Sequence, residues 1–93
     1  MESSVQTLQL ISGTFTPEDA LEILSDMIRS KINYHNLKNY TSIIRFDEED
    51  QASTQRIKEL SEMKEEISYQ IRTAGLMNKK VKLYSSVYIE FED

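Results

Sequence analysis

The feature that most constrains the fold is an apolar stripe between residues 52 and 74. Its members recur at alternating spacings of three and four residues, which places them on one side of an α-helix. The stripe consists of Ile57, Leu60, Lys64, Ile67, Ile71 and Ala74. Five of these six positions are apolar, and Lys64 can lay its methylene groups on a core. A helix with one apolar side needs a partner surface, which the rest of the chain must supply.

A longer helix is predicted upstream, over residues 17 to 44. Thr16 can cap it, and Pro17 suits the first helical position. Two neighbouring stripes give this helix a broad apolar face, wide enough to contact both a helix and a sheet. They are Leu21, Leu24, Ile28, Ile32 and His35, and Ala20, Ile23, Met27, Tyr34 and Leu37. Because no Gly or Pro interrupts residues 18 to 45, we expect one helix, with a break near residues 39 and 40 as the alternative.

The connection between the helices is the acidic run Asp47 to Asp50. Four like charges repel one another and stay solvated, and Asp50 can cap the second helix. That helix is expected over residues 51 to 74 and should end in a left-handed turn at Gly75. Two long helices joined by a short loop should form an antiparallel hairpin.

A strand is predicted at each end of the chain. Residues 5 to 11 are β-branched and apolar up to Ser12 and Gly13, but both parities carry apolar residues, so the inward face stays open. Residues 80 to 92 alternate cleanly, with one apolar face. Because the hairpin returns to its start, the strands should pair antiparallel and cover one side of it. The expected fold class is α+β, a single domain over residues 1 to 93 with the order strand, helix, helix, strand and with the long helical hairpin packed on the two-stranded antiparallel sheet.

A two-stranded sheet is marginal by itself and leaves an open edge. The last strand can cover that edge with a second copy of itself, antiparallel, with Ser86 opposite Ser86. One face then pairs Lys80 with Glu92, Lys82 with Glu90, and Tyr84 with Tyr88. The other face pairs Val81 with Phe91, and Leu83 with Ile89. Opposite charges and aromatic pairs stabilise such ladders, so we expect a homodimer with a four-stranded sheet. The alternative is that these charges only solubilise an edge strand.

Composition narrows the possible functions. The net charge of -5, from 16 acidic and 11 basic residues, argues against a general nucleic-acid binder. The absence of cysteine removes disulfides, thiolate chemistry and Cys-based zinc sites. With no basic-then-apolar start and no long apolar run, we expect a cytoplasmic protein without a membrane segment.

His35 is the only histidine, and it lies on an apolar stripe. We interpret it as a partly buried packing residue with one hydrogen bond; the alternative is a small pocket with Asn36 and Tyr40. Neither a nucleophile motif nor a glycine-rich phosphate loop appears. The acidic run 47–50 lacks the ligand spacing of a calcium loop. We therefore assign no catalytic, metal or cofactor-binding residue, and we expect no enzyme and no cofactor.

Three functions remain as hypotheses. The first is a non-enzymatic, homodimeric interaction or regulatory module that presents a helical face or the outer sheet face to a protein. The second is a small enzyme or ligand-binding protein with a site near His35. The third is binding of single-stranded nucleic acid by Lys80, Lys82, Tyr84 and Tyr88. Glu90 and Glu92 share that face and oppose the third hypothesis.

Residues 12–20 and 30–38 together resemble a family of small bacterial proteins of unknown function. The resemblance covers about the first half of the chain. It implies a cytoplasmic bacterial or mobile-element protein and carries no activity with it. Within the resemblance, residues 30–35 are where a site would be sought.

Overall fold

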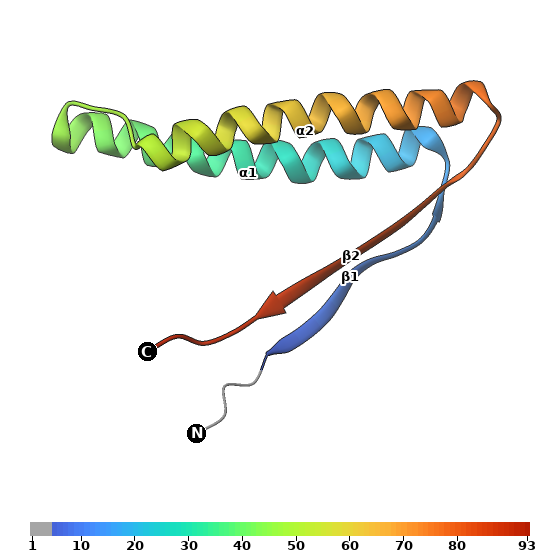
Figure 1. Cartoon of the computed structure of the whole chain (residues 1–93), viewed down its shortest axis with the longest axis horizontal. Coiled ribbons are helices and arrows are strands. Elements are labelled where there is room, and N and C mark those ends of the chain that lie inside the picture. Colours follow the sequence, from blue (N-terminus) through green and yellow to red (C-terminus); the bar gives the residue numbers. More distant parts are fainter. Residues whose placement is uncertain (1–4) are drawn as a thin grey trace.

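The structure is a computed structural model that describes residues 5–93. Its elements follow one another as β1 (Gln6–Phe15), α1 (Pro17–Phe46), α2 (Gln51–Leu76) and β2 (Val81–Ile89) (Figure 1). The helices form an antiparallel hairpin, and the strands form a two-stranded antiparallel sheet. The predicted α+β class and the order strand, helix, helix, strand are confirmed.

The predicted caps set the start of both helices. Thr16 Oγ1 accepts a hydrogen bond from the backbone N–H of Asp19 at 3.2 Å. An Asp50 side-chain oxygen likewise accepts from the N–H of Ser53 at 3.1 Å. Helix α1 continues unbroken to Phe46, two residues past the expected end. Asp47 then adopts the left-handed conformation (φ 58°) and its N–H bonds to the Ile43 carbonyl.

The predicted end of the second helix at Gly75 is wrong. Gly75 is helical, and the residue with positive φ is Asn78 (φ 55°). The N–H of Lys79 bonds to the Ala74 carbonyl at 2.9 Å, and the N–H of Asn78 to the Gly75 carbonyl at 3.1 Å. These two bonds are those of a Schellman motif with asparagine at its left-handed position. Asparagine tolerates that conformation, so the helix gains a further half turn.

The hairpin packs through the two stripes that the sequence predicts for this contact. All six residues of the α2 stripe are buried or half-buried, and so are the five of the first α1 stripe. The buried apolar side chains of the described residues are few: Ala20, Ile28, Leu60 and Ile71. The core of a single chain is therefore a narrow seam between the helices.

The strands differ from their predicted bounds. β1 runs through Ser12 and Gly13 to Phe15, because Gly13 takes extended backbone and pairs with Leu83. β2 is shorter than the predicted range 80 to 92 and ends at Ile89, which is opposite Gln6, the first residue of β1. Beyond Ile89 the described chain offers no partner strand.

A β-bulge at Leu10 settles which face of β1 is apolar. Gln9 is opposite Ser86 and Ile11 is opposite Ser85, so Leu10 has no partner in β2. Directly opposed residues share a face of the sheet. The bulge therefore puts Leu8 and Ile11, which have opposite parities, on the same face. That apolar ribbon face comprises Leu8, Ile11, Phe15, Val81, Leu83, Val87 and Ile89.

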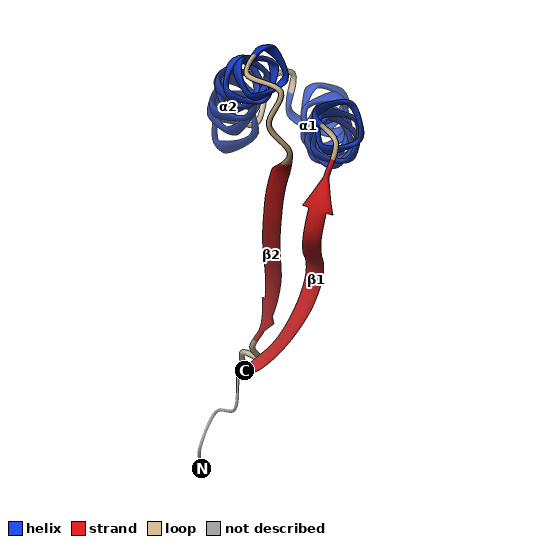
Figure 2. Ribbon diagram, turned by 90° about the vertical axis from the view of Figure 1, so that its right-hand side faces the viewer, coloured by secondary structure: helices blue, strands red, loops and turns tan. Residues whose placement is uncertain are grey.

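The ribbon of two strands meets the hairpin only at its base. From there it diverges from the helices toward the chain termini (Figure 1), and a view along the hairpin shows it extending away from both helices (Figure 2). The radius of gyration is 17.0 Å, whereas a compact domain of this length has about 12 Å. The chain is thus an open V with the hairpin as one arm and the ribbon as the other.

Candidate functional site

The apolar face of the ribbon looks toward the hairpin but is covered only at the base of the V. There Val81 and Leu83 line a hollow of about 410 Å³ together with Leu24, Ile67 and Ile71 of the helices. Farther along the ribbon, Leu8 is 56% exposed and Val87 is 38% exposed. The described residues therefore leave Leu8 and Val87, in the far half of this face, largely uncovered.

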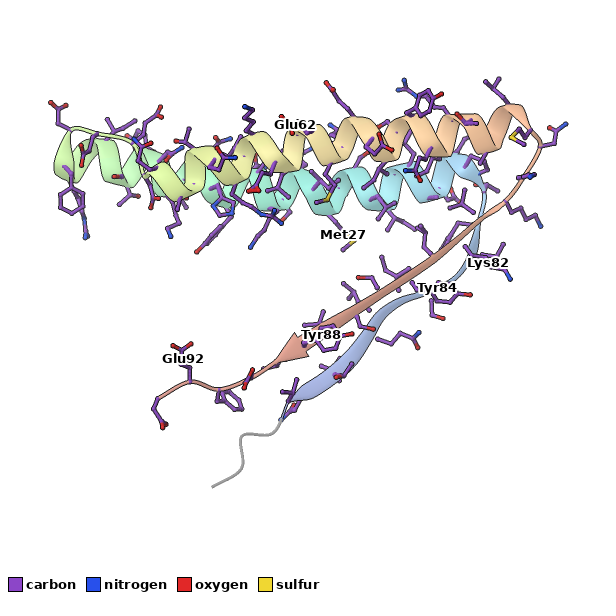
Figure 3. The ribbon with its side chains drawn as sticks, viewed as in Figure 1. Met27, Glu62, Lys82, Tyr84, Tyr88 and Glu92 are labelled. Atoms are coloured by element: carbon purple, nitrogen blue, oxygen red, sulfur yellow. The ribbon has the colours of Figure 1, made fainter. Side chains whose placement is uncertain are left out.

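The facing side of α1 is uncovered in the same way. Ala20 and Ile23, near the base, are buried and half-buried, but Met27 is 38% exposed and Tyr34 is 53% exposed. Met27 points from α1 into the space between hairpin and ribbon (Figure 3). Tyr34 lies two turns farther on the same side. We call Leu8, Val87, Met27 and Tyr34 the inner apolar surface.

The total accessible surface is larger than that of a compact monomer. It is 7688 Å², whereas a compact monomer of this mass exposes about 5,600 Å². The excess of about 2,000 Å² exceeds the roughly 800 Å² that each partner contributes to a standard protein interface. This chain therefore carries enough uncovered surface for a large interface.

The opposite face of the ribbon is polar and carries most residues of the predicted dimer contact. Lys82, Tyr84, Ser86 and Tyr88 alternate along β2 on this face, opposite Thr14, Ser12, Gln9 and Thr7. Tyr84 and Tyr88 are 70% and 72% exposed. Lys80, Glu90 and Glu92 flank the strand beyond its hydrogen-bonded bounds and are exposed. Within the described chain β2 pairs only with β1, so its second edge is open.

His35 belongs to a polar contact between the helices, not to a pocket with Asn36 and Tyr40. Its Nδ1 lies 3.0 Å from Ser53 Oγ, and Ser53 is only 1% exposed. Asn36 and Tyr40 are exposed and lie on other sides of α1. Around the helix axis, Asn36 is rotated from His35 by about 100° and Tyr40 by about 140°. None of these three residues lines the hollow at the base of the V, nor two further surface hollows, one beside Phe46 and one beside Tyr69.

Further hydrogen bonds extend this contact toward the loop. Asn39 Oδ1 accepts from the N–H of Asp50 at 3.0 Å, and Asn39 Nδ2 donates to Thr54 Oγ1 at 3.3 Å. Ser42 Oγ donates to the Glu48 carbonyl at 2.8 Å. His35, Asn39 and Ser42 are spaced four and three residues apart, so they share one side of α1. These hydrogen bonds join α1 to α2 and to the loop at the loop end of the hairpin. We call the residues that form them the polar clasp: His35, Asn39, Ser42, Ser53 and Thr54.

The electrostatics of His35 favour its neutral form. Burial lowers the pKa of the imidazole, and the positive charges of Lys31, Lys38 and Arg56 lower it further, while Asp50 acts in the opposite direction. His35 Nε2 is buried without a hydrogen-bond partner. Because Ser53 is 1% exposed, its hydroxyl is enclosed beside His35.

Sequence reasoning missed most members of the clasp. Ser53, Asn39, Ser42 and Thr54 carry no motif, and a serine in the first turn of a helix is ordinary. Periodicity was the signal that could have found them. Asn39 and Ser42 continue the stripe that runs from Leu21 to His35, but they are polar, which indicates a polar contact with α2 at this end of the helix.

No three His, Cys, Asp or Glu side chains among residues 5–93 lie together as potential metal ligands. Over the same residues, neither helix combines the length and apolar character needed to cross a membrane. Comparisons with protein families, with curated proteins and with solved structures found no match for this chain. The resemblance of residues 12–20 and 30–38 to small bacterial proteins stays a prediction.

Proposed function

We propose that this protein is a non-enzymatic, homodimeric interaction module whose two copies join along the free edge of β2. The observation that carries this proposal is the exposed surface of 7688 Å², about 2,000 Å² above that of a compact monomer. A chain with an uncovered apolar face and an open strand edge gains stability when a partner covers both.

The sequence of β2 favours a second copy as that partner. With Ser86 opposite Ser86, a two-fold axis pairs Lys82 with Glu90 and Tyr84 with Tyr88 twice over. No residue of β2 is bulged against β1, so its alternation is regular and Lys82, Tyr84 and Tyr88 fall on the polar ribbon face. Glu90, the first residue after β2, would continue this alternation when the two copies pair. Opposite charges directly across the ladder then stabilise this register and oppose a shifted one.

The module would present its outer surfaces to a protein partner. Tyr84 and Tyr88 of both copies would gather near the middle of the four-stranded sheet, on the face opposite the hairpins. Exposed tyrosines are well suited to protein recognition because each combines a large apolar ring with a polar hydroxyl. We expect this module in the cytoplasm of a bacterium, as the resemblance of residues 12–20 and 30–38 implies.

A charge exchange tests the pairing. Lys82→Glu places like charges opposite Glu90 twice in the dimer, so its dissociation constant should rise on the order of tenfold. The double variant Lys82→Glu/Glu90→Lys restores both pairs and should recover the original constant. Sedimentation or light scattering on dilution series of each variant measures the change.

Lys58→Glu is the matched control, because it makes the same charge change on an exposed position of α2. It should leave the dissociation constant unchanged. If the double variant dissociates as readily as Lys82→Glu alone, the copies are not paired along β2 in this register.

A further inference from the structure

We propose that, in this dimer, each hairpin lies over the apolar ribbon face of the other copy, so that the two open chains close into one shared core. This inference rests on the proposed β2 pairing. It adds that the hairpin of the second copy fills the space between the hairpin and the ribbon of the first. Pairing of strand edges joins backbones but leaves the inner apolar surface uncovered, so a second contact is needed to bury it.

Symmetry places both apolar ribbon faces together. The two-fold axis of an antiparallel pair stands perpendicular to the sheet, so it keeps each face on its own side. Rows of residues then continue from copy to copy across the four strands. Ile11 and Ser85 of one copy fall in line with Val87 and Leu8 of the other. The exposed residue Val87 thus comes to lie beside the two-fold axis, at the middle of the joint apolar face, and Leu8 lies next to it on the outer strand β1.

Reversal of direction then brings the second hairpin into the first V. Because the paired strands run antiparallel, the base of the second hairpin stands at the free end of the first ribbon. Phe91, which is 79% exposed, comes opposite Val81 of the second copy. In that copy Val81 is itself paired with Phe15, at the base of its hairpin. The uncovered end of one copy therefore meets the covered end of the other.

The uncovered area of each chain is as large as the area that a dimer with a shared core would bury. Each chain has an excess surface of about 2,000 Å², well above the roughly 800 Å² per partner of a standard interface and within the range of obligate dimers. Met27 and Tyr34 on the hairpin side and Leu8 and Val87 on the ribbon side supply the apolar character that obligate interfaces have. Folding and assembly of this protein are then one process.

Single cysteines test the arrangement, since the chain has none of its own. Leu8→Cys and Met27→Cys place a thiol on each side of the inner apolar surface. Gln9→Cys and Glu62→Cys are matched controls, because Gln9 lies on the polar ribbon face and Glu62 points away from the ribbon (Figure 3). The reaction rate of each thiol with a maleimide is measured in the folded protein, relative to its rate in denaturant, after light scattering has given the mass.

In a dimer, both test thiols should react at least about tenfold more slowly than the controls, since the second copy covers them. A dimer in which either Leu8→Cys or Met27→Cys reacts at the control rate would overturn the shared core and leave the β2 pairing intact. A monomer at every concentration would overturn the pairing itself, and the shared core with it. Both test positions are exposed in the single chain, so neither substitution disturbs the packing within one copy, and the mass of the unsubstituted protein decides the pairing.

Discussion

Single residues at the loop end of the hairpin show how polar groups can hold two helices in register. The interpretation of His35 as a packing residue with one hydrogen bond agrees with its contact to Ser53. The identity of its partner could not be predicted, because it depends on the exact offset between α1 and α2. That offset is set by the loop 47–50 and by the Asp50 cap, neither of which fixes a partner from sequence alone.

The stability of the protein should depend on the protonation of His35. Burial and the nearby cations lower the pKa of His35 in the folded state, so on acidification the unfolded state binds the proton first. The stability is then highest above the ordinary histidine pKa of about 6.5 and falls as the pH drops toward the lowered folded-state pKa. Urea unfolding from about pH 7.5 to about pH 5.5 measures this slope.

His35→Gln is the control for this prediction. Because the chain contains one histidine, the variant should remove the slope from this pH range and leave the effects of the carboxylates at lower pH. Parallel profiles for the wild type and His35→Gln would show that His35 is equally easy to protonate in the folded and unfolded states.

Among the elements, the helices were the more predictable and β1 the less. The stripe of α2 predicted its packing side correctly because a period near 3.6 leaves one consistent face. β1 has apolar residues on both parities, and only the bulge at Leu10 reconciles Leu8 with Ile11. The missed end of α2 has a similar cause, since glycine and asparagine both suit the left-handed position and the sequence offers both, at Gly75 and Asn78.

Deletion of Leu10 tests the role of the bulge. Leu10 has no partner in β2 and is 59% exposed, so its removal leaves Gln9 opposite Ser86 and Ile11 opposite Ser85 in a regular ladder. The free energy of unfolding should change by less than about 1 kcal/mol, because no buried group is lost. Urea denaturation at fixed protein concentration measures it.

Deletion of Thr14 is the matched comparison in the same strand. It shifts residues 10 to 13 by one position, which moves Ile11 to the polar face, Ser12 to the apolar face and Leu10 into the place of Ile11 opposite Ser85. The free energy of unfolding should fall by at least about 1 kcal/mol, because the Ser12 hydroxyl then lies on the apolar face beside Leu83. Equal stability of the two deletion variants would mean that the face of β1 has no packing role.

On the scale of the whole molecule, the sequence predicted the order of elements and their antiparallel arrangement. It did not predict that the ribbon diverges from the hairpin and leaves Met27 and Tyr34 uncovered (Figure 1). Hydrophobic patterning indicates which side chains need cover, but it does not say whether the same chain or another supplies it. The broad apolar face of α1 was the sequence signal for this uncovered surface. In the structure α2 covers one of its two stripes, and the ribbon covers only the beginning of the other.

The solution mass, measured by light scattering across a dilution series, tests the central claim most directly. We predict a mass of twice 10.9 kDa, with dissociation on dilution accompanied by loss of helical structure, because the copies share their core. A folded species of 10.9 kDa at every concentration would contradict the account. The open edge of β2 would then be left for a strand from a different protein.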